Sequence, residues 1–219
     1  MTQKTKITAV LFDFGGVLAE EGFKDGLHAI AIQNGLDPDI LLATAFEIIY
    51  ETGFVLGKVR EDVFWKALGD RFAIRGRPEK WREEILSRFT LRPWMLEAAC
   101  ELKKGRIVLG LLTDQCHWLD ELNKRDRFFD CFDHIFNSYY THISKKDPAA
   151  FDRVSKKLQI PPENILFIDD HEAHILRAQQ RGLQTILYLD KKSFLEQLNR
   201  VVCESDELQI SLPSVIGQG

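Results

Sequence analysis

An apolar run that ends in a carboxylate constrains this chain more than any other segment. Residues 7–12 are apolar apart from Thr8, and Asp13 follows them directly, just ahead of Gly15 and Gly16. Because apolar and polar residues do not alternate, the run predicts a strand buried on both faces, as in a parallel sheet covered by helices. An ionised carboxylate is costly to place there unless it is paired, binds a metal or takes part in chemistry. The alternative is an Asp that only caps a turn.

Polar residues follow two further apolar runs at their predicted strand ends: Thr113 and Asp114 after residues 107–112, and Asp169 and Asp170 after residues 165–168. In open α/β sheets the carboxyl ends of the strands line the crevice in which ligands bind. Lys145 and Lys146 add cations to the same neighbourhood. A hydroxyl, a lysine and several carboxylates at one sheet edge indicate phosphate and divalent-metal chemistry.

Strands and helices alternate along most of the chain. Further strands are predicted at 134–136 and 185–188, and helices at 93–103, 117–124, 148–158 and 172–180. Four more helices are predicted in one uninterrupted group at 27–33, 39–50, 61–72 and 79–89. The alternation predicts an α/β fold with a doubly wound, Rossmann-like parallel sheet. The predicted division is a core of residues 1–19 and 92–202, a small α-helical cap domain of residues 20–91, and a mobile tail of residues 203–219.

Four segments carry a family resemblance: Asp13 with residues 16–18, Thr113 after its strand, Lys145 ahead of residues 147–151, and Asp169 with Asp170. In order and spacing they resemble the four motifs of the haloacid dehalogenase superfamily of hydrolases, most of which are phosphatases. The resemblance covers roughly residues 7–190. It implies a core with the Asp13 strand at its centre and an α-helical cap, inserted after the first motif, that closes over the site.

The resemblance also implies roles for individual residues. Asp13 would be the nucleophile that forms an aspartyl-phosphate, which divides one difficult displacement into two easier ones. Mg²⁺, which prefers oxygen ligands, would be held by Asp13, the backbone carbonyl of Gly15 and Asp170, with Asp169 either a ligand or behind the ligands. For Asp169 and Asp170 the alternative is a helix N-cap. The phosphoryl group would be bound by Thr113, Lys145 and backbone N–H groups.

Three positions depart from the family pattern. Gly15 stands where phosphatases of the family carry a second Asp, the acid that protonates the leaving oxygen, and such an acid contributes ~10²–10⁴-fold in rate. Its absence predicts a slow enzyme, a substituted acid or a lost activity. Asp114 stands where Asn is frequent, and it is either a substrate-binding residue, a carboxylate turned away from the phosphate, or a replacement acid. Lys146 takes the usual proline position, which leaves open whether Lys145 or Lys146 faces the site, and we prefer Lys145.

We therefore expect a Mg²⁺-dependent hydrolase, a phosphatase of a small phosphorylated metabolite. One alternative is a catalytically weak or silent phosphate-binding or regulatory module, and another is a dehalogenase or phosphonate hydrolase. The cap aromatics, Phe46, Tyr50, Phe54, Phe64 and Trp65, are expected to form the core of the cap itself. Glu20 and Glu21 follow the first strand into the cap and could approach a substrate, but the default expectation for them is a solvated linker.

Composition limits the partners and the compartment. The 219 residues, 45% hydrophobic and 28% charged, suit a globular protein of one or two domains. A net charge of −4 gives no basic surface for nucleic acid, and no apolar stretch approaches the ~20 residues of a membrane span. Four scattered cysteines without metal-ligand spacing favour reduced thiols in the cytoplasm. Nothing in the sequence indicates the oligomeric state or the substrate.

Overall fold

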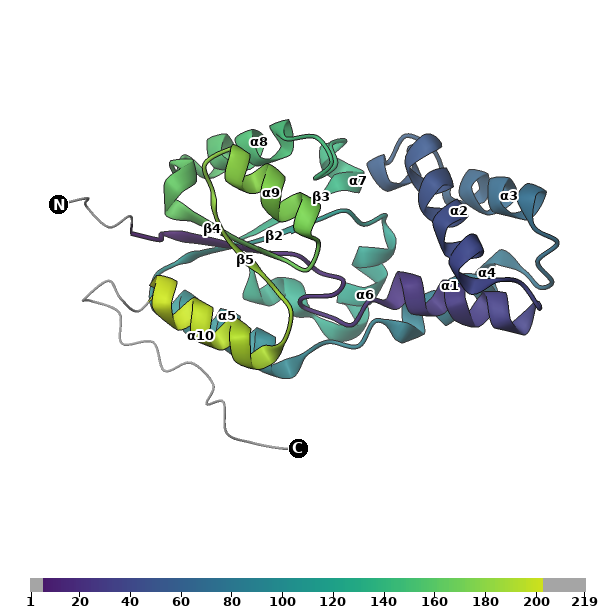
Figure 1. Ribbon diagram of the computed structural model, residues 1–219, viewed down its shortest axis with the longest axis horizontal. Helices are drawn as coiled ribbons and strands as arrows, with labels where there is room; N and C mark the ends of the chain where they lie inside the picture. Colours follow the sequence, from purple (N-terminus) through teal and green to yellow (C-terminus); the bar gives the residue numbers. More distant parts are fainter. Residues whose placement is uncertain (1–5, 203–219) are drawn as a thin grey trace.

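The computed structural model describes residues 6–202 (Figure 1). Residues 1–5 of the predicted core and the predicted tail 203–219 lie outside the described residues. The strands are β1 (Ala9–Phe12), β2 (Val108–Thr113), β3 (His134–Asn137), β4 (Ile165–Asp169) and β5 (Gln184–Leu187). The helices are α1 (Gly22–Gln33), α2 (Pro38–Glu51), α3 (Glu61–Arg71), α4 (Pro78–Arg88), α5 (Pro93–Lys104), α6 (Trp118–Asp126), α7 (Ser138–Thr141), α8 (Ala149–Leu158), α9 (Glu172–Gln180) and α10 (Lys191–Val202). Three 3₁₀ turns are η1 (Phe54–Leu56), η2 (Phe128–Cys131) and η3 (Pro162–Asn164).

The five strands form one parallel sheet in the order β3-β2-β1-β4-β5. The Asp13 strand is therefore central, as the resemblance implies. Phe12, the last residue of β1, pairs with Leu111 of β2 and with Ile168 of β4. This register brings the polar residues that follow the three strands to one edge of the sheet. It also places them where the strand order reverses, which is the usual position of a ligand crevice.

Helices cover both faces of the sheet, which completes a doubly wound α/β fold (Figure 1). Alternate side chains of β1 enter different cores, because successive residues of a strand point to opposite faces. Ala9 and Leu11 belong to the cluster that includes residues of α8 and α9, whereas Val10 and Phe12 belong to the cluster that includes residues of α5, α6 and α10. Both faces of the sheet are buried at β1, which explains why residues 7–12 form a near-continuous apolar run. The predicted fold class is confirmed.

The sequence pattern also contained a helix that we did not predict, α10. Four of its five apolar residues, Phe194, Leu195, Leu198 and Val202, are buried. Their spacing of three to four residues is that of one helical face. Phe194 packs against Trp94 at the start of α5 and against Tyr188 after β5, with ring centroids 5.9 Å apart in both pairs. This helix closes one face of the core.

Helices α1 to α4 form the predicted insertion after β1 and lie to one side of the sheet (Figure 1). The two segments that lead into and out of it are joined by backbone hydrogen bonds, from Glu20 N–H to Thr90 (2.9 Å) and from Arg92 N–H to Leu18 (2.9 Å). The Arg92 guanidinium donates to the carbonyls of Gly16, Val17 and Ala19 at 2.5, 2.7 and 3.1 Å. We propose residues 20–91 as the cap and this pair of segments as its connection.

Glu61, the first residue of α3, links the insertion to the core. Its carboxylate accepts hydrogen bonds from the indole N–H groups of Trp65 (2.7 Å) and of Trp118 in α6 (3.1 Å). It also pairs with Arg82 in α4 (3.2 Å) and His117 (3.4 Å). Burial alone would raise the pKa of Glu61, but these donors outweigh it and lower the pKa from 4.5 to about 2. Trp118 and His117 belong to the core, so the contact joins the two parts.

We expect Glu61→Gln to lower the free energy of unfolding by about 1–3 kcal/mol at pH 7, since it weakens hydrogen bonds to a charged group. The folded-state pKa lies below the unfolded one, so the charge stabilises above pH 4.5. The difference from wild type should therefore shrink as pH falls from 4.5 towards 2. Urea unfolding across this range measures it. Glu121→Gln, which removes a more exposed partner of Arg82, is the control, and an equal effect there would contradict the prediction.

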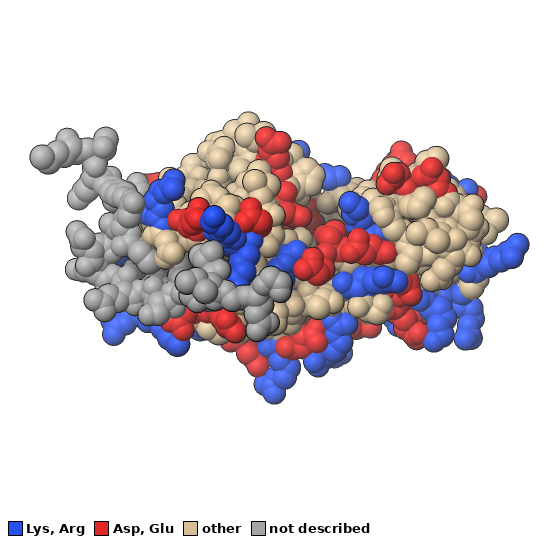
Figure 2. All heavy atoms as spheres, turned by 60° about the horizontal axis from the view of Figure 1, so that its bottom comes forward, with Lys and Arg blue, Asp and Glu red and all other residues tan. Residues whose placement is uncertain are grey.

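On the face drawn in Figure 2, acidic and basic side chains intermingle over both parts of the molecule. Between residues 6 and 202, no helix combines the length and the apolar character required to cross a membrane. Of the cysteines, Cys203 lies outside the described residues, and Cys100, Cys116 and Cys131 are free thiols. Cys116 is buried, and burial holds its pKa well above the usual range.

Candidate active site

Asp13 follows the central strand and lies at the floor of a cavity between core and insertion. Its side chain is held at both oxygens: Oδ1 accepts the N–H of Phe14 at 2.7 Å, and Oδ2 pairs with Lys145 Nζ at 2.8 Å. Only 8% of the residue is exposed. Burial raises the pKa of Asp13 to about 7; Lys145 opposes this rise, and the carboxylates of Asp169 and Asp170 add to it. The strand-end Asp is thus paired rather than only capping a turn.

Lys145 is the lysine that faces the site. It is 1% exposed, and its Nζ lies 2.8 Å from Asp13 and 2.7 Å from Asp169. Burial lowers the pKa of a lysine, but the carboxylates outweigh it and hold the pKa of Lys145 above its usual range. Lys146 instead lies over the ring of Tyr50, 3.2 Å from its centroid. The side chains of the two adjacent lysines therefore lie in different surroundings, and the geometry agrees with the prediction that Lys145 is the one that faces the site.

Asp169 and Asp170 have different surroundings although they are adjacent. Asp169 is fully buried, and besides Lys145 it accepts the N–H of His171 at 2.7 Å and faces His174 Nδ1 at 3.2 Å. Burial would raise its pKa, but Lys145 and His174 outweigh burial and lower it. Asp170 is exposed and faces the cavity, where burial and Asp169 raise its pKa. Helix α9 is capped by His171, whose Nδ1 accepts the N–H of Ala173, so neither Asp is its N-cap.

Three carboxylates converge on one point. One oxygen each of Asp13, Asp169 and Asp170 lies within 4.8 Å of the others. Carboxylate oxygens are the ligands that Mg²⁺ prefers. Lys145 is the one cation within ion-pair distance of this group among the described Lys and Arg side chains, so the cluster carries excess negative charge that a divalent cation would offset. The residues present therefore fit a magnesium ion. The part of the Gly15 carbonyl in such a site stays a prediction.

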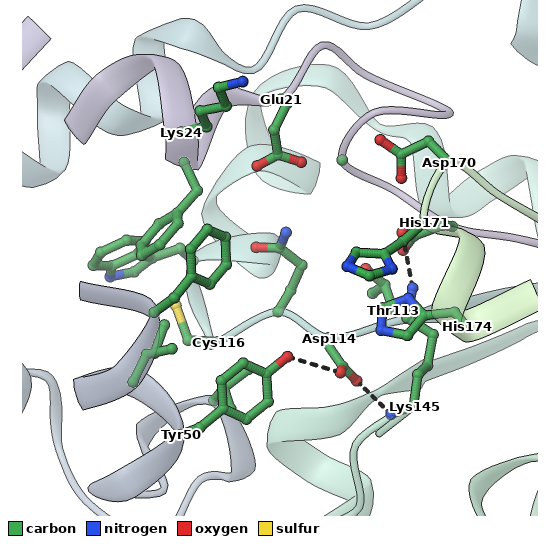
Figure 3. Close-up of a pocket in the computed structure, with 18 residues that line it drawn as sticks. Glu21, Lys24, Tyr50, Thr113, Asp114, Cys116, Lys145, Asp170, His171 and His174 are labelled. Atoms are coloured by element: carbon green, nitrogen blue, oxygen red, sulfur yellow. Dashed lines mark hydrogen bonds and ion pairs between the residues drawn. The ribbon is translucent and has the colours of Figure 1, made fainter. Parts of the chain in front are cut away.

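Thr113 and Asp114, at the end of β2, also line the cavity. Thr113 is 1% exposed. Asp114 accepts three hydrogen bonds, from the hydroxyls of Tyr50 (3.0 Å) and Ser144 (2.6 Å) and from the backbone N–H of Lys145 (3.0 Å). Asp114 therefore positions the Lys145 backbone and ties α2 to the core (Figure 3). A substrate contact for Thr113 or Asp114 stays a prediction.

The wall opposite the carboxylates is mainly apolar. Its lining includes Phe23, Phe46, Ile49, Tyr50, Val55 and Trp118. The expectation that the cap aromatics form only the cap's own core is wrong for Phe46 and Tyr50. Phe46 is 42% exposed, whereas Phe54, Phe64 and Trp65 are buried. The reason is helical geometry: successive turns of α2 present Phe46 and Tyr50 on one side, towards the cavity.

Glu21 is a site residue, contrary to the default expectation that it lies in a solvated linker. It lies just before α1 and lines the cavity, with its carboxylate directed inwards and Asp170 across from it (Figure 3). Burial raises the pKa of Glu21 to about 7, with further contributions from Asp13 and Asp170. An acid shortly after the first motif was the available signal, but the sequence alone could not tell a linker that faces water from one that faces the cavity.

Comparison with known proteins places these residues in a family. The model of the haloacid dehalogenase-like hydrolases matches residues 7–182. Bifunctional epoxide hydrolase 2 of Rattus norvegicus is 30% identical over 142 residues, 62% of this chain and 24% of that protein. The chain thus spans about a quarter of the length of that relative. The D-ribitol-5-phosphate phosphatase of Bacteroides thetaiotaomicron is 25% identical over 82% of this chain and 90% of its own length.

A solved structure shows the same fold. A HAD family enzyme from Bacteroides thetaiotaomicron, in complex with magnesium and inorganic phosphate, superposes with a TM-score of 0.69 at 22% identity. The match covers 86% of this chain and 98% of that one. Motif order, sheet topology and family model agree, and this chain belongs to the haloacid dehalogenase-like hydrolases.

Proposed function

We propose that this hydrolase is a Mg²⁺-dependent phosphatase of small phosphomonoesters. The observation that carries the proposal is the buried pairing of Lys145 with Asp13 at the cavity floor, beside Asp169 and Asp170. A carboxylate held in place by a lysine and adjoining further carboxylates suits attack on a phosphoryl group. The named phosphatase among its relatives and the magnesium and phosphate in the related structure support the proposal.

In this proposal Asp13 attacks phosphorus and forms an aspartyl-phosphate, and water then releases phosphate. Mg²⁺ held by Asp13, Asp170 and the Gly15 carbonyl, with Asp169 close by, would lower the repulsion between the phosphate and these acids. Lys145 keeps Asp13 oriented and supplies positive charge for the transferred group. Thr113 donates its hydroxyl to a phosphoryl oxygen.

The apolar wall indicates what the rest of the substrate is. A cavity of about 220 Å³ suits a small molecule. The alcohol part would lie against Phe46, Ile49 and Val55, which offer no polar side-chain groups to a polyol. The Tyr50 hydroxyl is already engaged by Asp114. We therefore favour phosphates of apolar alcohols over sugar phosphates.

The test is phosphate release from matched phosphomonoesters, with Mg²⁺ and with chelator. The panel contains alkyl phosphates of increasing length and polyol phosphates of similar size. Metal-dependent release, faster for the alkyl series, is the expected result. Binding of phosphate without turnover would favour the regulatory module. Halide release without metal, or cleavage of a carbon–phosphorus bond, would replace the phosphatase by one of the other two hydrolases.

Gly16→Ala should abolish metal-dependent phosphate release. Gly16 has φ +78°, and a Cβ there would lie 1.9 Å from Asp170 Oδ2, so the substitution must displace a proposed metal ligand. The control is Gly35→Ala, because Gly35 has φ +67° with nothing near its Cβ. Both variants should lose about 1–3 kcal/mol of stability through backbone strain, measured by urea unfolding, and only Gly16→Ala should lose activity. Equal activity in the two variants would contradict the prediction.

A further inference from the structure

The space around position 15, and not its backbone conformation, is what requires a glycine there. The glycines of residues 6–202 that have positive φ include Gly16 but not Gly15, so any residue could adopt the Gly15 conformation. A Cβ built on Gly15 would lie 2.6 Å from Glu21 Oε2, closer than real Cβ contacts, and 3.6 Å from Gln115 Nε2. The Glu21 carboxylate thus occupies the space that a side chain at position 15 would enter.

The other acids of the cavity already have partners or proposed roles. Asp169 forms an ion pair with Lys145, and Asp114 accepts three hydrogen bonds. Asp13 and Asp170 are the proposed nucleophile and metal ligand. Glu21 has no ion pair with any Lys or Arg of residues 6–202, and its carboxylate points into the cavity, towards the side where Asp170 lies (Figure 3).

We propose that Glu21 is the catalytic acid and base of this enzyme, in place of the acid that is absent at position 15. The inference rests on the phosphatase function proposed above. An alkoxide is a poor leaving group until it receives a proton, and a correctly placed acid contributes ~10²–10⁴-fold. The carboxyl group of Glu21 comes from the start of the insertion rather than from the first motif. The position of the insertion relative to the core therefore sets the position of the acid.

The proton and the electron pairs balance over two steps. In the first, an Asp13 oxygen forms a bond to phosphorus, the P–O bond to the alcohol breaks, and the leaving oxygen keeps the electron pair. That oxygen takes the proton of the Glu21 carboxyl, so the products are the alcohol and the Glu21 carboxylate. In the second, a water oxygen bonds to phosphorus, its proton passes to Glu21, and the Asp13–phosphorus bond breaks to restore the Asp13 carboxylate.

The experiment compares Glu21→Gln with wild type on two substrates. On an alkyl phosphate, whose leaving group needs a proton, turnover should fall ~10²–10⁴-fold. On 4-nitrophenyl phosphate, whose leaving group needs little help, the first step should survive and the second should not. Glu21→Gln should then release a burst of one nitrophenol per active site and retain phosphate on the protein. Glu83→Gln, at an exposed carboxylate of α4 that pairs with Lys80, is the control and should match wild type in both assays.

A second variant tests the position of the carboxyl group. In Gly15→Asp/Glu21→Ala the space beside Gly15 is free, and the carboxyl group returns to within reach of the leaving oxygen. We expect at least ~10-fold faster alkyl phosphate turnover than in Glu21→Ala alone, within the range of acid catalysis. No gain over Glu21→Ala would overturn the proposal and would show that Glu21 acts otherwise than through this carboxyl position.

The outcomes separate this inference from the phosphatase proposal. In one outcome wild type releases phosphate and Asp13→Asn does not, while Glu21→Gln keeps the wild-type rate on the alkyl phosphate and shows no burst with 4-nitrophenyl phosphate. The proposed role of Glu21 is then wrong, and the phosphatase proposal stands. If wild type releases no phosphate from any ester, the phosphatase proposal fails and the role of Glu21 falls with it. Thermal unfolding of each variant confirms that it is folded.

Discussion

Asp13→Asn is expected to reduce phosphate release on the order of 10⁴-fold or more, because removal of a nucleophile leaves only binding and electrostatic effects. The amide keeps the size of the side chain and its hydrogen bond with Phe14 N–H, so substrate can still enter. It lacks the negative oxygen that attacks phosphorus. The measurement is Mg²⁺-dependent phosphate release at saturating alkyl phosphate, with wild type and variant purified side by side.

The stability of the same variant shows whether the loss is chemical. Burial raises the pKa of Asp13 from 3.8 to about 7. A folded-state pKa above the unfolded one means that the charged group opposes folding at pH above 3.8, increasingly up to about 7. At pH 8 in chelator, Asp13→Asn should therefore unfold at the same temperature as wild type or a higher one. Retained activity would show that Asp13 is not the nucleophile, whereas a lower melting temperature would show that its charge supports the fold.

Lys145→Met is expected to lower the free energy of unfolding by about 3–5 kcal/mol, since it leaves buried carboxylates without their cation. Methionine fills much of the space of the lysine stem, so the lost charge dominates. Asp13 and Asp169 both lie within 2.8 Å of Lys145 Nζ, and the pKa values of both carboxyl groups would rise in the variant. Urea unfolding at pH 7 measures the loss, and activity should disappear as well.

The pH dependence distinguishes lost charge from lost packing. In wild type, Lys145 lowers the pKa of Asp169 below 3.8, so their pairing stabilises above that pH. In Lys145→Met the two carboxylates take up protons more readily, so the deficit should shrink towards pH 4. Lys146→Met removes only an exposed cation over the Tyr50 ring and should cost no more than about 1 kcal/mol. A deficit independent of pH would assign the effect to packing.

The strand ends could be predicted from the sequence because their signal is local. An apolar run that stops at Asp13, Thr113 or Asp169 indicates that the strand is buried and also where the strand ends. Once the sheet is parallel, these ends must meet at one edge. The fold class and the convergence of the carboxylates follow from this argument. The central place of the Asp13 strand came from the family resemblance, and α10 could have been predicted from its own periodicity.

Side-chain direction within a loop, and the face that an inserted helix presents, depend on contacts between segments far apart in the chain. Lys145 and Lys146 are indistinguishable by type, and only the packing of the loop after α7 turns one to Asp13 and the other to Tyr50. Glu21 reaches the space beside Gly15 because the Arg92 junction positions the start of α1. Alternation and burial are local properties of the chain, so the amino-acid sequence was enough to show which groups gather at the sheet edge. Which of these groups face the cavity depends on how the insertion packs against the core, and that is a property of the folded molecule.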